Sequence, residues 1–244
     1  MRKLWLWLCL PLTGLLLLSA CSRQASPRTV GELARGTEEN RIICLREGDD
    51  YVPFLAVDAD YGGNVLLIRQ DLLSPQPVNC SGSGFYPGSD IDVYLNGPYL
   101  DSLGLPSDAV VLSEIQVTSA SALGLAGQET ETIRRKVFLL SLTEIGIQDP
   151  VAGGQEGHPL AWFHSAERRI AFDESQAASW WLRTPNTYYR SCFYGVGPDG
   201  SIGCGNAYDE NGIRPALCVS SQLPITEKEG LIEGRCVFVL SQED

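Results

Sequence analysis

The residues best suited to chemistry in this chain are aromatic and polar side chains that can hold a ligand. Most of them lie in a stretch rich in Trp, Phe and Tyr between His158 and Tyr208. Aromatic faces stack on sugar rings or peptide side chains, and Asn, Asp and Arg supply directional hydrogen bonds. We therefore predict a ligand-binding surface that contains Trp181, Arg183, Tyr188, Tyr189, Tyr208, Asp209 and Asn211.

Two arginines in this part of the chain have a second interpretation. Arg183 and Arg214 each lie in a short strand-like run that a proline follows closely. Proline removes a backbone donor and favours extended geometry in the residue before it, so each run should be a short strand that ends abruptly. We favour the interpretation in which both arginines are internal struts that pair a carboxylate or loop carbonyls.

Catalytic motifs are absent from the sequence. His158 and His164 are the only histidines, and His164 next to a serine is weak evidence for a hydrolase. Neither a Gly-x-Ser-x-Gly elbow nor a His-Glu-x-x-His motif occurs. The sequence therefore favours a protein that is not an enzyme.

Calcium is the one cofactor that the sequence leaves open. Residues 58–63 superficially resemble a calcium loop, but Arg69 stands where an EF-hand needs a carboxylate. We predict a hairpin turn there instead. The acidic loop 206–211 is the other place where calcium could bind, and we predict no other cofactor.

The chain begins with the pattern of a secretory signal peptide over residues 1–20, in which a basic start precedes an apolar run. The segment Leu18–Cys21 resembles the lipobox of bacterial lipoproteins, in which the cysteine is lipidated. This resemblance implies an exported protein that is anchored to the membrane by lipid on Cys21. An uncleaved anchor and ordinary cleavage after Ala20 are the alternatives.

The segment after the signal is polar and contains helix-breaking residues, apart from a short helical start around 30–35. We interpret residues 21–41 as a tether and residues 42–244 as one globular domain. Removal of residues 1–20 leaves 16 basic against 30 acidic residues, a formal net charge of −14. Nucleic acid and anionic lipid headgroups repel such a surface. The expected partner is a surface glycan or protein, membrane contact is through the lipid only, and the oligomeric state stays open.

Cysteine usage also fits export, because an even number of cysteines remains outside the signal peptide and the lipidation site. Up to three disulfides can form among them, and the sequence does not determine their connectivity. Cys192 and Cys204 should lie diagonally on one face of a hairpin that turns at 197–200, and Cys218 could bond to Cys236. The absence of a Cys-x-x-C pair argues against zinc. The disulfide candidates are Cys44, Cys80, Cys192, Cys204, Cys218 and Cys236.

Hydrophobic patterning predicts many short strands in the globular part. Runs at 41–46, 51–57 and 64–69 are separated by Gly and Asp, which is typical of an antiparallel meander. The continuously apolar run 136–142 predicts a buried central strand. A helix should start after Ser89 and stop at Gly97-Pro98.

The adjacent residues Trp180 and Trp181 cannot face the same side of a strand. One of them must therefore be exposed or covered by another layer of structure. We expect Trp180 to pack inward and Trp181 to face the loops.

Several segments occur together in an order that resembles a bacterial family of exported proteins and lipoproteins of unknown function. Members of that family carry WWLR(S/T)P and G(V/I)RPAL segments, which correspond here to Trp180–Pro185 and Gly212–Leu217, and the resemblance covers roughly residues 42–220. Its pattern is in turn similar to the C-type-lectin-like fold, which lectin domains share with formylglycine-generating enzymes. This resemblance implies an α+β fold of antiparallel strands, short helices and long loops, in which the two segments lie side by side near the ligand-bearing loops.

We therefore interpret the protein as a surface lipoprotein that acts as a non-catalytic binding or interaction module for a glycan or protein. An alternative is an oxidase of the formylglycine-generating type, for which Cys192, Cys204 and Cys218 lie in the right region but without the expected motif. A third interpretation, a structural subunit of a surface assembly, predicts a partner protein and no small ligand.

Overall fold

The fold consists mostly of β-strands. The computed structural model describes residues 27–37, 41–106, 108–148, 153–232 and 235–240. Strands account for 43% and helices for 14%, with one helix of seven or more residues. The predicted α+β class, with its C-type-lectin-like architecture, is therefore wrong, and the protein is closer to all-β. The reason lies in the short apolar runs between turns, most of which pair as strands.

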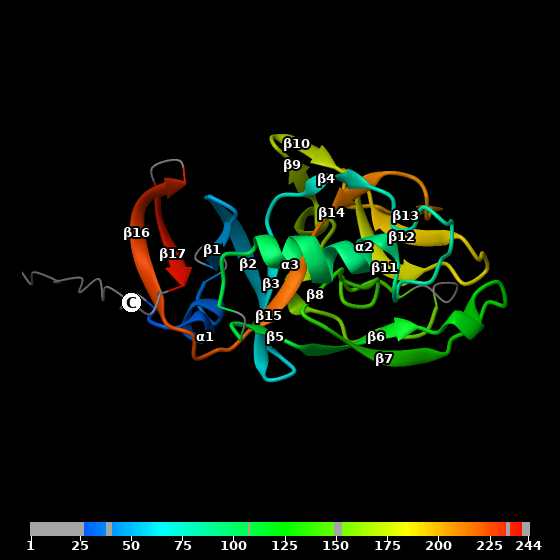
Figure 1. Cartoon of the computed structure of the whole chain (residues 1–244), viewed down its shortest axis with the longest axis horizontal. Helices are drawn as coiled ribbons and strands as arrows, with labels where there is room; N and C mark the ends of the chain where they lie inside the picture. The colour runs from blue at the N-terminus through cyan, green and yellow to red at the C-terminus, as the bar shows by residue number, and fades with distance from the viewer. Residues whose placement is uncertain (1–26, 38–40, 107, 149–152, 233–234, 241–244) are drawn as a thin grey trace, which may run out of the picture.

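The larger sheet has eight strands, in the order β16-β17-β1-β2-β3-β15-β5, with β8 also paired to β15 (Figure 1). In chain order these are β1 (Ile42–Glu47), β2 (Asp50–Tyr61), β3 (Asn64–Arg69), β5 (Val110–Val111), β8 (Val137–Phe138), β15 (Ala216–Val219), β16 (Ile225–Ile232) and β17 (Arg235–Leu240). The predicted antiparallel meander β1-β2-β3 is confirmed. Its second turn is at Gly62 and Gly63, both of which have positive φ, as a tight hairpin requires.

The second sheet has five strands, in the order β13-β12-β11-β14-β4. These are β4 (Leu73–Gln76), β11 (Trp180–Pro185), β12 (Cys192–Val196), β13 (Ile202–Asn206) and β14 (Asn211–Ile213). Trp180 pairs with Gly212 in parallel, so the two motif segments are neighbours, as expected. The second segment divides at Arg214-Pro215, because β14 belongs to this sheet whereas β15 belongs to the larger one.

Two hairpins and short helices complete the fold. The hairpins are β6 (Ser113–Thr118) with β7 (Thr130–Arg135), and β9 (Ala171–Asp173) with β10 (Gln176–Ala178). The helices are α1 (Val30–Ala34), α2 (Asp90–Tyr94), the π-helical turn η2 (Leu95–Tyr99), α3 (Leu100–Ser102), and the 3-10 turns η3 (Ala120–Ala122), η4 (Ala161–Phe163) and η5 (Glu167–Arg169). Ser89 caps α2 by accepting a hydrogen bond from the Asp92 amide. Gly97-Pro98 does not stop this helix, since Pro98 lies inside the π-helical turn that joins α2 to α3.

The predicted central strand at 136–142 is only partly confirmed. Val137 and Phe138 pair with β15, but residues 139–142 follow no strand, although their side chains are buried. Their backbone groups bond to side chains and to β11 instead. The Arg183 amide, for example, donates to the Leu140 carbonyl oxygen at 2.9 Å. Burial without a strand partner is therefore possible here because other groups satisfy the backbone.

Both tryptophans of β11 are fully buried. They lie on opposite faces of the strand, and each face has its own cover. The Trp180 indole donates to the Arg169 carbonyl oxygen, and the Trp181 indole donates to the Gln76 carbonyl oxygen, each at 3.0 Å. Trp180 packs inward as expected, whereas the expectation that Trp181 faces the loops is wrong, because its indole is covered as well.

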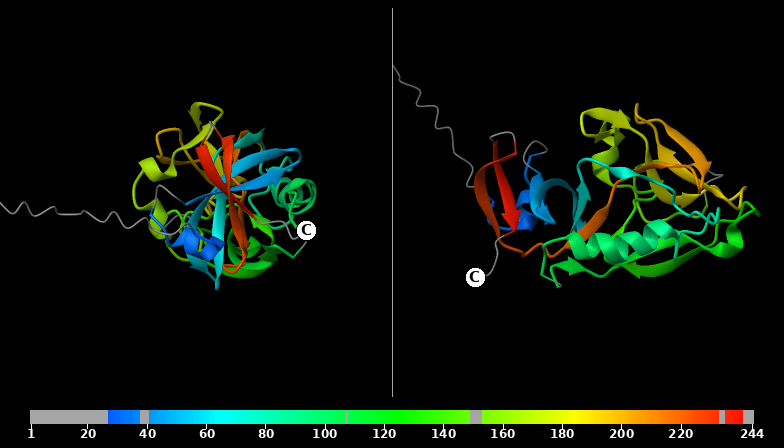
Figure 2. Two further views of the ribbon diagram at one scale, coloured as in Figure 1. Left: turned by 90° about the vertical axis from the view of Figure 1, so that its left-hand side faces the viewer. Right: turned by 45° about the horizontal axis from the view of Figure 1, so that its top comes forward.

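Different strands and helices form the two ends of the elongated molecule. Strands β16, β17 and β1 and helix α1 form one end, and β11, β12 and β13 lie towards the other (Figures 1 and 2). Val30, Leu33 and Ala34 are buried in the core, so the folded unit includes part of the predicted tether. The predicted signal peptide and Cys21 lie outside the described residues. None of the helices within those residues is long and apolar enough to cross a membrane.

Two glycines of the β12–β13 hairpin should respond differently to substitution by alanine. Gly200 has φ +78°, and a Cβ there would lie 2.1 Å from the Ala166 carbonyl oxygen, whereas a Cβ at Gly203 meets nothing within 4 Å. Gly200→Ala should therefore lower the free energy of unfolding by about 1–3 kcal/mol. Gly203→Ala should change it by less than about 1 kcal/mol. Urea denaturation of both variants tests this, and equal losses would contradict it.

Candidate ligand-binding site

The Arg183 side chain lies in the protein core and forms a buried ion pair with Glu144. Its Nη1 and Nη2 donate to the two carboxylate oxygens of Glu144 at 2.7 and 2.9 Å, and both side chains are fully buried. The remaining donors reach the carbonyl oxygens of Gln116 and Leu139. Burial alone disfavours the charged guanidinium, but the Glu144 carboxylate outweighs it and raises the pKa of Arg183. The prediction of an internal strut is confirmed for this residue.

Two further groups extend the network around this ion pair. Tyr61 of β2 donates to Glu144 Oε1 at 2.6 Å. Glu156 accepts hydrogen bonds from the Thr118 amide and hydroxyl and from the Thr184 hydroxyl. Burial raises the pKa of Glu156 in spite of the nearby Arg183 charge. The network therefore joins β2, β6 and β11, which belong to three different sheets.

Arg214 is the second internal strut, and it pairs with loop carbonyls. Its Nε donates to the Arg69 carbonyl oxygen at 3.1 Å, and its guanidinium lies over the Trp180 ring. Burial lowers the pKa of Arg214 to about 10, partly opposed by Asp71. Nη1 has no hydrogen-bond partner among the described residues. Arg214 therefore holds the 69–71 segment against β11.

Three tyrosines form the most exposed aromatic group near the far end of β12 and β13. Tyr188, Tyr189 and Tyr208 are 59%, 57% and 56% exposed, respectively. Tyr188 and Tyr189 precede the first residue of β12, and Tyr208 follows the last residue of β13, at the same end of this pair of strands. We call these three residues the tyrosine surface. Its position is the one that the sequence predicted for ligand contacts.

The loops that carry the tyrosine surface are held firmly. Asn186 is buried, and its side-chain oxygen accepts from the Tyr188 amide at 3.1 Å. The Thr187 carbonyl oxygen accepts from the amides of Gly124 and Ala126. The Ala207 amide donates to the Ser191 carbonyl oxygen at 2.7 Å, which ties one loop to the other. Exposed rings on a constrained backbone lose little conformational entropy when they bind.

A cleft of about 210 Å³ lies on the five-stranded sheet, towards the 197–200 turn of the β12–β13 hairpin. We call it the glycine cleft, because four glycines contribute to its lining. Its other lining residues include Trp181 and Asn211, both predicted from the sequence. The complete lining consists of Ser179, Trp181, Gly195, Val196, Gly197, Ser201, Ile202, Gly203, Cys204, Gly205 and Asn211.

Pairing between the strands explains why the cleft is hollow. Gly195 of β12 lies opposite Gly203 of β13, so two neighbouring positions on one face lack side chains. The Trp181 indole covers only part of this face. Its atoms lie 3.6 and 3.1 Å from the positions that a Cβ would take at Gly195 and Gly205, whereas Gly203 remains open.

The seven predicted ligand-binding residues fall into three places in the structure. Trp181 and Asn211 line the glycine cleft, although Trp181 is fully buried. Tyr188, Tyr189, Tyr208 and Asp209 lie in the loops at the Cys192 and Asn206 ends of β12 and β13, and the Asp209 carboxylate accepts a hydrogen bond from the Asn206 amide. Arg183 lies apart, inside the core. The glycines were not predicted as site residues, although their alternation at 203 and 205 was the signal that could have shown an open strand face.

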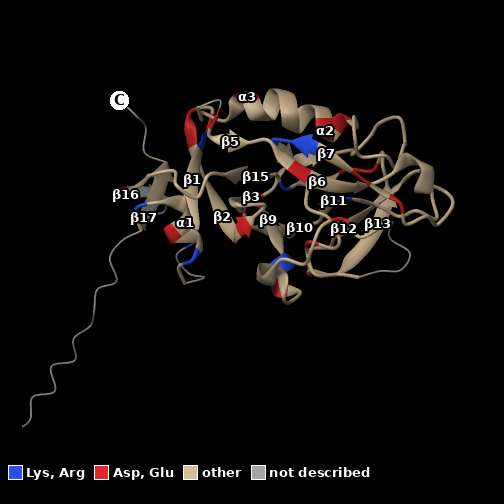
Figure 3. Cartoon of the chain, turned by 90° about the horizontal axis from the view of Figure 1, so that it is seen from below, with Lys and Arg blue, Asp and Glu red and all other residues tan. Residues whose placement is uncertain are grey.

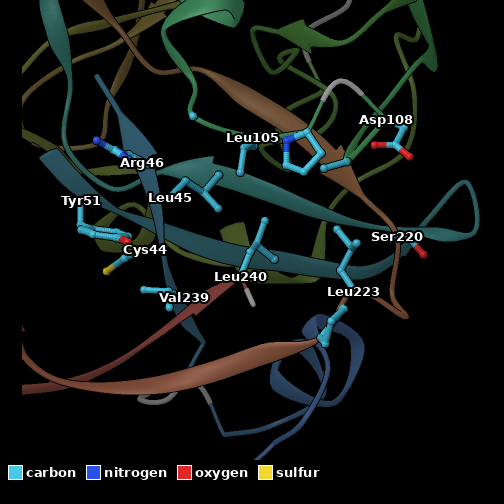
Figure 4. A pocket seen from close by; sticks show the side chains of 14 residues that line it. Cys44, Leu45, Arg46, Tyr51, Leu105, Asp108, Ser220, Leu223, Val239 and Leu240 are labelled. Atoms are coloured by element: carbon cyan, nitrogen blue, oxygen red, sulfur yellow. The ribbon is translucent and has the colours of Figure 1, made fainter. Parts of the chain in front are cut away.

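A larger cavity of about 680 Å³ lies at the opposite end of the molecule (Figure 4). Its walls come from β1, Tyr51 of β2, residues 104–106 and 108–109, the 220–224 segment and β17, and many of its side chains are apolar. None of the predicted ligand-binding residues lines it. Sequence reasoning missed this cavity because its walls come from segments near residues 45, 105, 222 and 239, which are far apart in the chain.

The described cysteines form no disulfide: Cys44, Cys80, Cys192, Cys204 and Cys218 are all free thiols. The predicted register of the β12–β13 hairpin is confirmed, since Cys192 faces Asn206 and Tyr194 faces Cys204. The suggested bond between Cys218 and Cys236 is wrong. Their strands, β15 and β17, are separated by β1, β2 and β3, or roughly 19 Å at the usual strand spacing, far beyond the reach of a disulfide.

Possible metal ligands are scattered in the described part of the chain. Among those residues no group of three or more His, Cys, Asp or Glu side chains is placed to hold a metal ion. Cys192 and Cys204 lie in the five-stranded sheet, whereas Cys218 lies in the larger one. The three thiols considered for an oxidase are therefore not brought to one place.

The sheet arrangement and the motif segments can be compared with known proteins. Residues 62–221 match the model of a family described as a domain of unknown function, DUF6273. The chain belongs to this family. No curated protein and no solved structure matches it. The resemblance to C-type-lectin-like proteins is thus not confirmed by these comparisons.

The two cavities differ in how far they lie within the residues that match DUF6273. Every residue that lines the glycine cleft lies within 62–221, as does the tyrosine surface. The larger cavity takes much of its lining from β1 and β17, which lie outside that range. The glycine cleft and the tyrosine surface are therefore the features that belong to the family domain itself.

Removal of one partner from the buried ion pair should strongly destabilise the protein. Glu144→Gln would leave the Arg183 charge buried without a full counter-charge, so we expect a loss of about 3–5 kcal/mol in the free energy of unfolding. Glu114→Gln breaks an exposed pair with Arg134 and should cost less than about 1 kcal/mol. Chemical denaturation measures both, and similar losses would show that Arg183 is not the strut proposed.

In the reduced protein, the rate at which each cysteine thiol reacts with an alkylating reagent should depend on how deeply that thiol is buried. Cys80 and Cys204 are exposed, whereas burial raises the pKa of Cys44 to about 11 and that of Cys218 to about 12. A maleimide or iodoacetamide should therefore modify Cys80 and Cys204 in the native state and reach Cys44 and Cys218 only after unfolding. Peptide mass spectrometry identifies the modified residues. Rapid native labelling of Cys218 would contradict the position of β15.

Proposed function

We propose that this protein is a surface-anchored lipoprotein whose DUF6273 domain acts as a non-catalytic binding module. The observation that carries the proposal is the tyrosine surface, in which three rings are each more than half exposed on loops that are fixed by buried residues. Tyrosine supplies a large contact area at low entropic cost, together with a hydroxyl for hydrogen bonding. A group of exposed rings on one end of a sheet is typical of an interaction site.

The position of the tyrosine surface in the molecule supports the same function. The described chain starts at Pro27, and Thr29 forms a bridge with Pro224 at the end of the molecule that holds α1, β16 and β17. A lipid on Cys21 would lie six residues before Pro27, within roughly 20 Å of it. Strands β12 and β13, whose flanking loops carry the tyrosine surface, lie towards the opposite end (Figure 1). An anchored molecule can therefore present it away from the membrane.

The net negative charge of the protein argues against a polyanionic partner. The whole chain carries a formal net charge of −12. Its described Lys and Arg residues are spread over several elements, among them Arg134 and Arg135 of β7 (Figure 3). A spread of this kind favours a neutral or basic ligand over nucleic acid or another polyanion.

The deeply buried charged residues interact with one another in the core and are not available to a ligand. Arg183, Glu144 and Glu156 satisfy one another inside the core, where a ligand has no access. These charged groups therefore stabilise the fold. A structural subunit remains the second candidate, because exposed tyrosines also suit a protein partner.

Substitution of the tyrosine surface should weaken binding without affecting the fold. The full chain, in a detergent that has no sugar headgroup, would be screened on arrays of glycans and of surface proteins. For any hit, Tyr189→Ala or Tyr208→Ala should raise the Kd about tenfold or more, since such a ring is typical of binding hot spots. Tyr51→Ala, a tyrosine at the opposite end, is the control. Hits that none of the tyrosine variants weakens would contradict this proposal.

A further inference from the structure

We propose that the ligand of this module is a neutral glycan, and that the glycine cleft holds one of its sugar units. The inference rests on the proposed function and names its ligand class. The cleft, at about 210 Å³, lies below the roughly 300–1,000 Å³ of sites that enclose a drug-sized molecule. It therefore suits a single small ring whose neighbours in a chain continue outside.

The walls of the cleft supply the two kinds of contact that a sugar ring needs. Gly195 and Gly203 expose strand backbone that no side chain covers, and the buried Trp181 indole packs beside them on the same face. The C–H face of a sugar can lie against such a surface. Ser179, Ser201 and Asn211 line the same cleft and carry hydroxyl or amide groups that can bond to sugar hydroxyls.

The lining also indicates that the bound unit is uncharged. No residue that lines the cleft is charged. A sulfated, phosphorylated or carboxylated sugar would lack a cationic partner there and would meet a molecule with a strong negative charge. A neutral hexose or N-acetylhexosamine needs no cationic partner and is not repelled by the negative charge of the protein.

The tyrosine surface continues the site beyond the cleft. Gly205 lines the cleft and lies next to Asp209. Tyr208 precedes Asp209 in the turn, and its exposed ring lies against the loop that contains Gly82. A glycan with one unit in the cleft can extend along β13, past Gly205, towards the exposed ring of Tyr208.

Gly203 offers a direct test, since its side-chain position is open. A Cβ at Gly203 meets nothing within 4 Å, so Gly203→Leu should fill the cleft and leave the strand intact. Thr132→Leu, at an exposed strand position of β7, is the matched control for added apolar bulk. The probes are immobilised neutral oligosaccharides of glucose, galactose, mannose and N-acetylglucosamine, each compared with a sulfated or carboxylated counterpart. Calorimetric titration of the best soluble oligosaccharide follows.

We expect binding to the neutral oligosaccharides, a loss of about tenfold or more in Gly203→Leu and no change in Thr132→Leu. Unfolding curves of the two variants must match the parent protein for the comparison to count, and Gly203→Ser is a smaller substitution that should give an intermediate loss. Binding that Tyr189→Ala weakens but Gly203→Leu does not would overturn the glycine-cleft assignment and leave the proposed function standing. Selective binding of the charged counterparts would overturn the neutral-glycan proposal. Failure to bind any glycan or protein would overturn both proposals.

Discussion

The buried ion pair between Arg183 and Glu144 is the interaction on which the arrangement of the sheets depends. A guanidinium removed from water needs acceptors on several sides, and those acceptors come here from β6 and from the 139–144 segment. Tyr61 adds β2 of the larger sheet through its bond to Glu144. Because Arg183 lies only two residues after Trp181, the pair also fixes the strand that supports the glycine cleft. A residue expected at the ligand surface thus contributes by holding that surface in place.

Features that depend on short-range pattern could be predicted from the sequence. Alternating apolar runs and Gly-rich turns specified the β1–β3 meander, because both strand length and turn chemistry are local properties. The same holds for the β12–β13 hairpin. Gly200 takes the left-handed conformation that its turn requires, and this turn sets the register that places Cys192 opposite Asn206. Three exposed tyrosines were also identified, since their neighbours are turn residues.

Features that depend on contacts between distant segments could not be predicted in this way. Residues 139–142 are as apolar as a central strand, yet their backbone groups bond to Arg183, Glu144 and other groups that lie far away or outside any ladder. Pro98 continues a helix because a π-helical turn forms around it, which no local rule indicated. The expectation that Trp181 faces the loops failed for the same reason, since its indole bonds to the Gln76 carbonyl oxygen, more than a hundred residues earlier in the chain.

The glycine cleft follows from the tryptophan pair together with the small residues that oppose it. Two adjacent indoles on opposite faces of β11 each need room, and on the Trp181 face glycines at 195 and 205 provide that room. The indole occupies only the part of the face near those two residues, so Gly203 is left uncovered. A larger residue at 203 would fill this space at no steric cost, and packing alone therefore gives no reason for a glycine there. The open position is explained if the space is used by something other than the protein itself.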